Sequence, residues 1–163
     1  MNILILYDTV FGNTKKIAES IADGFSAAKA KVRLIQANEA EPRDIADADL
    51  LVVGSPTRAF RPTAATMKAL KDPLCTFTGK KFAAFDTRID PEEIKSAFFR
   101  KIVTGFGCAA DAIEKTLLKR GAVKIAEGHP FIVTGDQGSV LRKRETEIAF
   151  DWARTLLANA GSR

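Results

Sequence analysis

Apolar positions recur along the chain in two alternating patterns, one typical of buried strands and one typical of amphipathic helices. Residues 2–7 (NILILY) form a continuous apolar run rich in β-formers, as expected of a parallel strand covered on both faces. Ile17, Ile21 and Phe25 then recur at helical spacing, with charged residues on the other faces. By the same criteria we predict strands at residues 32–36, 50–54, 81–85 and 131–133, a short helix or turn at 42–48, and helices at 63–70, 109–120 and 148–157.

This alternation predicts the α/β class. Five strands and about five helices in turn indicate a single three-layer, doubly wound domain over residues 1–163, with a five-stranded parallel sheet. Ligands of such domains lie beyond the carboxyl ends of the strands. The segments that follow Tyr7, Gly54 and Phe85 are therefore the places to look for chemistry.

The first of these segments, residues 8–14, is suited to holding an anion. It joins a central strand to a helix start, where unpaired backbone N–H groups and the helix dipole favour negative charge. Thr9, Asn13 and Thr14 add side-chain donors, and Gly12 allows a close approach of the backbone. A nucleoside triphosphate loop would need the spacing G-x-x-x-x-G-K-[ST], which is absent here. The other interpretation is that Asn13 or Thr14 only caps the helix.

The second and third segments offer polar groups suited to a planar polar ring. Residues 54–62 (GSPTRAFRP) contain two prolines that stiffen the loop, two hydroxyls, two guanidinium groups and one aromatic ring. Residues 85–89 (FDTRI) place Asp86, Thr87 and Arg88 after the fourth strand. An ordinary loop explains either segment alone. Three such loops at one sheet edge favour a ligand.

Composition narrows the function classes. The apolar run near the start is too short for a signal peptide or a membrane span, so we expect a cytoplasmic protein. Cys75 and Cys108 lack metal-like spacing and are interpreted as reduced core thiols, and His129 as a turn residue. The net charge of +5 comes from basic residues spread along the chain without interleaved aromatics, so nucleic-acid binding is not supported.

Three further patterns have competing interpretations. Residues 105–110 (GFGCAA) fit the dinucleotide fingerprint G-x-G-x-x-A, but they follow the fourth strand instead of the first, so we assign Gly105 and Gly107 to a turn that enters a helix. Residues 142–144 (RKR) are either a solvated loop or a docking site for an acidic redox partner or NADPH phosphates. A third alternative, a phosphoacceptor receiver domain, needs an acidic pair after the first strand. Asp8 is the one acidic residue in that segment, so this alternative is excluded.

At the first loop the chain resembles flavodoxin-like proteins that bind FMN. Residues 7–14 (YDTVFGNT) are similar to the family pattern Y-x-[ST]-x-[TS]-G-N-T, with Phe11 where the family often has a hydroxyl residue. The second loop resembles the P-T-R-F-G pattern of flavodoxin-like quinone reductases, with Phe60 one position late. The resemblance covers essentially the whole chain and implies the strand order 2-1-3-4-5. It implies FMN contacts from Thr9, Val10, Phe11, Gly12, Asn13, Thr14, Pro56, Thr57, Arg58, Ala59, Phe60, Asp86, Thr87 and Arg88.

Two function classes follow from this resemblance. The first is an electron carrier or an FMN-dependent oxidoreductase, working with a redox partner protein or an NAD(P)H- or quinone-type small molecule, as a monomer or small homo-oligomer. The second is a flavodoxin-fold interaction module with weak or lost FMN binding. Arg58, Arg61 and Arg88 predict a hydroquinone potential less negative than that of acidic flavodoxins, because cations favour the anionic reduced flavin. Phe60 is either a stacking partner of the flavin or one more apolar loop residue, and Asp86 either pairs with Arg88 or handles a proton.

Overall fold

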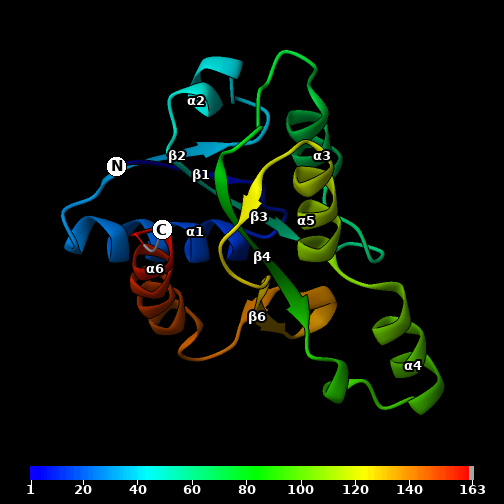
Figure 1. Cartoon of the computed structure of the whole chain (residues 1–163). Helices are drawn as coiled ribbons and strands as arrows, with labels where there is room; N and C mark the ends of the chain where they lie inside the picture. The colour runs from blue at the N-terminus through cyan, green and yellow to red at the C-terminus, as the bar shows by residue number, and fades with distance from the viewer. Residues whose placement is uncertain (162–163) are drawn as a thin grey trace.

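The computed structural model describes residues 1–161, except for the side chain of Val103. Strands alternate with helices, as the sequence predicts (Figure 1). The strands are β1 (Asn2–Tyr7), β2 (Lys31–Gln36), β3 (Leu50–Pro56), β4 (Lys81–Ile89), β5 (Val123–Lys124), β6 (His129–Thr134) and β7 (Val140–Leu141). The helices are α1 (Asn13–Ala27), α2 (Pro42–Ala46), α3 (Ala64–Lys71), α4 (Ala97–Phe106), α5 (Ala109–Lys119) and α6 (Glu145–Gly161), with short 3₁₀ turns η1 (Pro91–Glu93) and η2 (Asp136–Gly138).

The described strands form one sheet in the order β2-β1-β3-β4-β6-β7, with β5 also paired to β4. The predicted order 2-1-3-4 is confirmed, but the prediction of five parallel strands is wrong, because the sheet has seven strands and β7 runs antiparallel to β6. Two strands share the place of the predicted fifth strand beside β4. The first residues of β4 pair with β5, and its last residues pair with β6. Strands of two residues are too short to produce a readable alternation.

Two layers of helices cover the sheet. In Figure 1, α1 and α6 lie on one face, while α3 and α5 lie on the other. On the first face, Ile5 packs among buried residues of α1 and α6 that include Phe25 and Trp152. On the other face, Leu6 packs with Leu70 and Ile113. Because β1 and β3 are buried on both faces, their sequences are continuous apolar runs, and the predicted three-layer arrangement is confirmed.

β4 is longer than the sequence predicts, and this changes the third segment. The strand continues past Phe85 to Ile89, because residues 85–89 pair in register with β6. Asp86, Thr87 and Arg88 therefore lie in a strand and not in a loop. Gly54, at the end of the predicted second buried strand, has a packing role, since a Cβ there would collide with the Phe85 ring.

The helix α4 was not predicted. Its apolar residues have helical spacing, but the sequence predicts a turn at Gly105 and Gly107. Gly105 in fact lies within the last turn of α4, and only Gly107, with φ of 82°, forms the turn before α5. The dinucleotide alternative is wrong, because a helix and not a strand precedes the fingerprint.

The remaining predictions concern single residues. Cys75 and Cys108 are free and buried, as predicted. The interpretation of His129 as a turn residue is wrong: it begins β6, and its half-buried ring lies 4.5 Å from the Phe131 ring and 5.2 Å from the Trp152 ring. Burial lowers the pKa of His129 below its ordinary value of 6.5.

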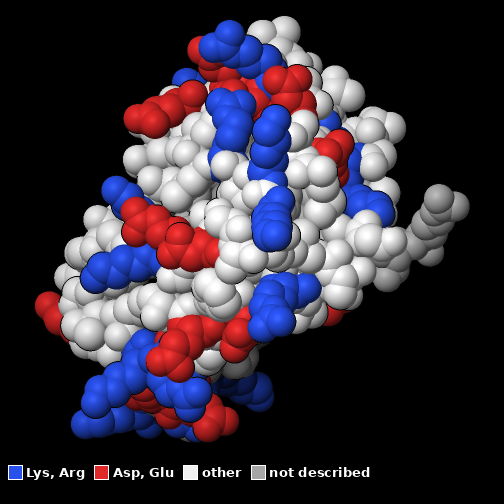
Figure 2. All heavy atoms as spheres, turned by 90° about the vertical axis from the view of Figure 1, so that its left-hand side faces the viewer, with Lys and Arg blue, Asp and Glu red and all other residues white. Residues whose placement is uncertain are grey.

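The surface charge is distributed in small groups. On the face drawn in Figure 2, Lys and Arg side chains are interleaved with Asp and Glu side chains. The basic run at residues 142–144 is largely paired locally, since Arg142 contacts Glu145 at 2.8 Å and Arg144 contacts Glu147 at 3.0 Å. Among residues 1–161, no helix is long and apolar enough to cross a membrane.

Candidate functional site

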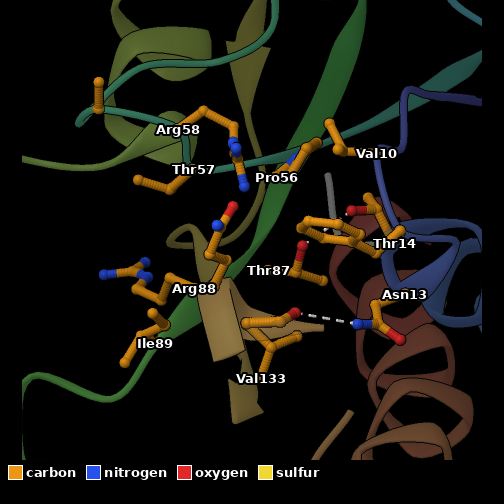
Figure 3. Close-up of a pocket in the computed structure, with 14 residues that line it drawn as sticks. Val10, Asn13, Thr14, Pro56, Thr57, Arg58, Thr87, Arg88, Ile89 and Val133 are labelled. Carbon is orange, nitrogen blue, oxygen red and sulfur yellow. Dashed lines mark hydrogen bonds between the residues drawn. The ribbon is translucent and has the colours of Figure 1, made fainter. Parts of the chain in front are cut away.

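A cavity of about 360 Å³ lies at the carboxyl ends of β1, β3 and β4, at the edge where the sequence predicts a ligand. Figure 3 shows its walls converging from α1, from the loop after β3, from β4 and from β6. The cavity is lined by Val10, Phe11, Asn13, Thr14, Pro56, Thr57, Arg58, Ala59, Thr87, Arg88, Ile89, Val133, Gln137 and Gly138. The predicted site residues Thr9, Gly12, Phe60 and Asp86 lie outside this lining.

The start of α1 opens onto this cavity without a side-chain cap. The N-cap is Gly12, whose φ of 85° is the left-handed conformation that glycine adopts without cost, so the interpretation of Asn13 or Thr14 as the cap is wrong. The first hydrogen bond of the helix runs from Lys16 N–H to the Gly12 carbonyl at 3.1 Å. The preceding N–H groups lack helical partners, and the first turn contains no acidic residue. This geometry favours an anion.

The side chains of the first loop hold its shape. The Thr9 hydroxyl oxygen accepts a hydrogen bond from Gly12 N–H at 3.0 Å. The buried amide of Asn13 donates to the Gly138 carbonyl at 3.1 Å, and the Thr14 hydroxyl lies 2.8 Å from that of Thr87. These contacts tie the loop to η2 and β4, and the backbone N–H groups of the first turn remain without partners in the helix.

A turn with a strained backbone, residues 58–61, follows β3. Arg58 and Arg61 exchange backbone hydrogen bonds of 2.9 and 3.0 Å. Ala59 and Phe60 between them both have positive φ, at 45° and 68°, as in a type I′ turn. For residues other than glycine this conformation costs about 1–2 kcal/mol each. Arg58 lies over the Phe11 ring at 5.5 Å from its centroid, at the cavity.

Asp86 lies beneath the cavity and organises its floor. Its fully buried carboxylate accepts hydrogen bonds from the Thr57 hydroxyl at 2.7 Å, Arg88 Nε at 2.8 Å and Ala110 N–H at 3.3 Å. Thr57 Oγ1 also accepts from Ala109 N–H at 2.8 Å, which ties the start of α5 to the loop. Burial alone would lower the pKa of Arg88, but the Asp86 carboxylate outweighs it and raises that pKa, so Arg88 stays charged. The geometry supports the pairing of Asp86 with Arg88 over a proton role.

Cys108 is close to this network but is poorly suited to nucleophilic chemistry. Burial, and then the nearby Asp86 carboxylate, raise the pKa of its thiol to about 12. Its backbone N–H donates to Asp111 at 3.0 Å, so the residue serves as the N-cap of α5. Within residues 1–161, no group of three or more His, Cys, Asp or Glu side chains is placed to hold a metal ion.

A second cavity of about 510 Å³ adjoins the first and shares with it the lining residues Thr57, Ala59, Arg88 and Ile89. Its wall is largely apolar, with contributions from η1 and α4. Of these two cavities Phe60 lines the second, and its ring packs against the Phe106 ring at 5.3 Å. The two cavities thus lie on either side of a common wall formed by the ends of β3 and β4.

Sequence reasoning missed the contribution of β6 and η2. Val133, Gln137 and Gly138 line the first cavity, and Gly138 also receives the Asn13 amide. A signal was present: residues 135–138 (GDQG) form a turn after the last predicted strand, whose carboxyl end reaches the same sheet edge. Ile89 was missed because β4 was expected to end earlier.

Comparisons with known proteins agree with this geometry. The family model for Flavodoxin matches residues 5–146. A flavodoxin from Aquifex aeolicus is 48% identical over 56 residues, which span 34% of this chain and 30% of the relative. The structure of oxidised Flavodoxin 1 from Bacillus cereus has a TM-score of 0.74 at 17% identity, covering 97% of this chain and 98% of that one. Rubredoxin oxygen:oxidoreductase from Desulfovibrio gigas has a TM-score of 0.67 at 19% identity, covering 99% of this chain and 37% of that protein.

The structural neighbours establish the fold, and the family model establishes the family. Its match begins within β1 and ends in the first turn of α6, so it includes the first loop, the turn after β3 and the end of β4. The chain belongs to the flavodoxin family.

Proposed function

We propose that this protein binds FMN and works in electron transfer. Membership in the flavodoxin family implies a flavin cofactor, and the uncapped start of α1, which opens onto a cavity at the carboxyl end of β1, is the observation that supports FMN in particular. Bound FMN would supply the one- and two-electron chemistry, while the protein supplies position and electrostatics.

The phosphate of FMN fits the first loop. Backbone N–H groups of Asn13, Thr14 and Lys15 precede the hydrogen-bond ladder of α1, and the helix dipole adds partial positive charge at the same place. Thr9 holds the loop in this form through Gly12. The buried side chains of Asn13 and Thr14 anchor the loop to η2 and β4, so their part in binding would be to hold the start of α1 at the cavity.

The isoalloxazine ring would lie where the two cavities adjoin, against the residues that line both of them. Thr57 and Ala59 would border it on one side, and Arg88 and Ile89 on the other. Thr57 and Arg88 are held in place by the buried Asp86 carboxylate. Fixed groups of this kind orient a planar ring and exclude water from part of it.

The arginines are unequal in their expected influence on the flavin. Arg88 is paired with Asp86, which offsets much of its charge, whereas Arg58 stacks on an aromatic ring. We therefore assign to Arg58 the larger part of the stabilisation of a reduced, anionic flavin. A redox partner protein fits the family, and a nicotinamide or quinone-type molecule is the small-molecule alternative. The interaction module without FMN is not favoured, because the loop, its brace and its cavity are all in place.

A comparison of two ligands tests this proposal. Flavin-stripped protein is titrated with FMN and with riboflavin, and the quenching of flavin fluorescence is followed. We expect FMN to bind at least tenfold more tightly, because riboflavin lacks the phosphate that the start of α1 would hold. Equal affinities would overturn the proposed phosphate site, and binding of neither ligand would overturn the flavin proposal.

A pair of glycine variants makes the test specific to the loop. Gly12 and Gly79 both have positive φ, at 85° and 75°, and a Cβ at either position meets no atom within 4 Å. Alanine at each therefore adds the same left-handed strain of about 1–2 kcal/mol without a clash. Gly12→Ala should weaken FMN binding by about tenfold and leave riboflavin binding unchanged. Gly79→Ala, at the opposite end of the sheet, is the matched control and should change neither.

A further inference from the structure

The helix α4 lies apart from the three-layer body. In Figure 1 it projects at the lower right, beyond the ends of β4 and α5. Its start is capped by Ser96, whose hydroxyl oxygen accepts from Phe99 N–H at 3.2 Å, and Arg100 donates to the Ile94 carbonyl at 2.8 Å. The helix is therefore well formed, although it covers little of the core.

One side of α4 presents an unusual set of exposed apolar side chains. Phe98, Phe99, Ile102 and Phe106 fall on one side at 100° per residue. Phe98 is 76% exposed, Phe99 53% and Phe106 70%. Single exposed apolar residues are normal on protein surfaces, but a contiguous aromatic group of this kind marks an interaction surface.

Basic residues surround this aromatic side. Lys95, Arg100 and Lys101 are all exposed, and no acidic residue occurs within α4. Arg58 and Arg61 are also exposed, and the contact between Phe60 and Phe106 places their turn beside the end of the helix. The exposed carboxylates nearby are those of Glu92 and Glu93 on η1 and of Asp111 at the start of α5, against five exposed cations. The balance around the aromatic side is therefore positive, which favours an anionic partner.

The composition and position of α4 favour a membrane surface over a second copy of the chain as the partner. A second copy of the chain would bring the same basic residues against each other. Lysine is depleted in protein–protein interfaces, yet it is usual beside the apolar face of helices that lie in a membrane surface. A projecting helix with phenylalanines on one side and basic groups around it has the form of such an interfacial helix.

We propose that α4 docks this protein onto the surface of an anionic phospholipid membrane. Phe98, Phe99 and Phe106 would enter the boundary between headgroups and acyl chains, and Lys95 and Lys101 would contact lipid phosphates. Phe99 also lines the second cavity, so docking would bring that cavity next to the lipid. The proposal concerns the surface of the protein and does not depend on FMN binding.

Vesicle sedimentation tests the proposal on the whole 163-residue chain. The protein is mixed with vesicles of phosphatidylglycerol and phosphatidylcholine in equal parts, or of phosphatidylcholine alone, and the bound fraction is measured at low and high salt. We expect binding to the anionic vesicles at low salt, with a loss of at least tenfold in partitioning in phosphatidylcholine or at high salt. Absence of binding to the anionic vesicles, or equal binding to both kinds, would overturn the proposal.

Matched variants identify the surface that binds. Phe98→Ser with Phe99→Ser should reduce partitioning at least tenfold, whereas Leu74→Ser with Leu118→Ser, at residues 76% and 48% exposed elsewhere, should not. Lys95→Gln with Lys101→Gln should cost about fivefold per lysine, and Lys68→Gln with Lys71→Gln on α3 is the equal-charge control. Far-ultraviolet circular dichroism checks folding. If the phenylalanine variants instead dissociate a dimer and leave vesicle binding intact, α4 is a self-association surface and the lipid proposal is wrong.

Discussion

Replacing Asp86 by asparagine is expected to destabilise the protein and to loosen the floor of the site. The carboxylate is fully buried, and one of its oxygens accepts from both the Thr57 hydroxyl and Ala110 N–H, while the other accepts from Arg88. Asparagine has the same shape but only one accepting oxygen. Whichever way the amide turns, at least one of these donors faces an NH₂ group and loses its partner.

The magnitude follows from the loss of charge-assisted hydrogen bonds. Hydrogen bonds to charged groups contribute about 1.5–3 kcal/mol each. The Arg88 side chain is 26% exposed, so water compensates part of its lost ion pair, and the total stays below the 3–5 kcal/mol typical of breaking a fully buried pair. We expect a loss of about 2–3 kcal/mol in the free energy of unfolding, which for a chain of this size lowers Tm by about 5–10 °C.

Urea and thermal unfolding measure this effect, and two further variants make it interpretable. Asp151→Asn removes an equal charge from an exposed position on α6 and should change stability by less than about 0.5 kcal/mol. Arg88→Gln should also destabilise, because it leaves the Asp86 charge buried and unpaired. The double variant Asp86→Asn with Arg88→Gln should lose less than the sum of the two single changes. If Asp86→Asn unfolds at the same midpoint as the unaltered protein, the role assigned to Asp86 is wrong.

Three other changes are predicted. Because burial holds the pKa of His129 below 6.5, the unfolded chain takes up its proton first as pH falls. The contribution of neutral His129 to the free energy of unfolding is therefore present above pH 6.5 and lost below it. The urea midpoint should drop between about pH 7.5 and 5.5, and this drop should be smaller in the variant His129→Gln. Burial raises the pKa of the thiols of Cys75 and Cys108, that of Cys108 to about 12. Ellman's reagent at about pH 8 should therefore react slowly with the native protein and quickly after unfolding. Fast reaction of the folded protein would contradict the burial of these thiols. In the FMN-loaded protein, Arg58→Gln should lower the hydroquinone potential more than the double variant Asp86→Asn with Arg88→Gln, because the double variant removes a paired anion and cation together. Spectroelectrochemical titration checks the order of these two shifts, and the reverse order would refute it.

The sequence predicted the elements whose signals are local. Residues 2–7 and 50–54 read clearly as buried strands because both faces of each are covered, so no polar residue interrupts the run. The first loop was also readable, because Gly12 stands with the donors Thr9, Asn13 and Thr14 between a buried strand and a helix start. Thr14 and Arg58 follow different strands and line the same cavity, because parallel strands end at one edge of the sheet.

What the sequence missed depends on contacts between distant segments. The extension of β4 to Ile89 requires pairing with β6, which lies about forty residues further along the chain. Gln137 reaches the cavity only because η2 folds back beside α1, where Gly138 receives the Asn13 amide. The exposed side of α4 has an amphipathic pattern without a core to cover, and a pattern alone does not distinguish a buried apolar face from an exposed one.

The central claim is that the start of α1 holds the phosphate of FMN. The most direct measurement is a two-dimensional ¹H–¹⁵N spectrum of the labelled protein, with the backbone amides of Asn13, Thr14 and Lys15 followed as FMN or riboflavin is added. The account predicts large shifts of these amide signals with FMN and small ones with riboflavin, since only FMN carries the anion that they would bind. Equal shifts with both ligands, or FMN-dependent shifts confined to other parts of the chain, would contradict it.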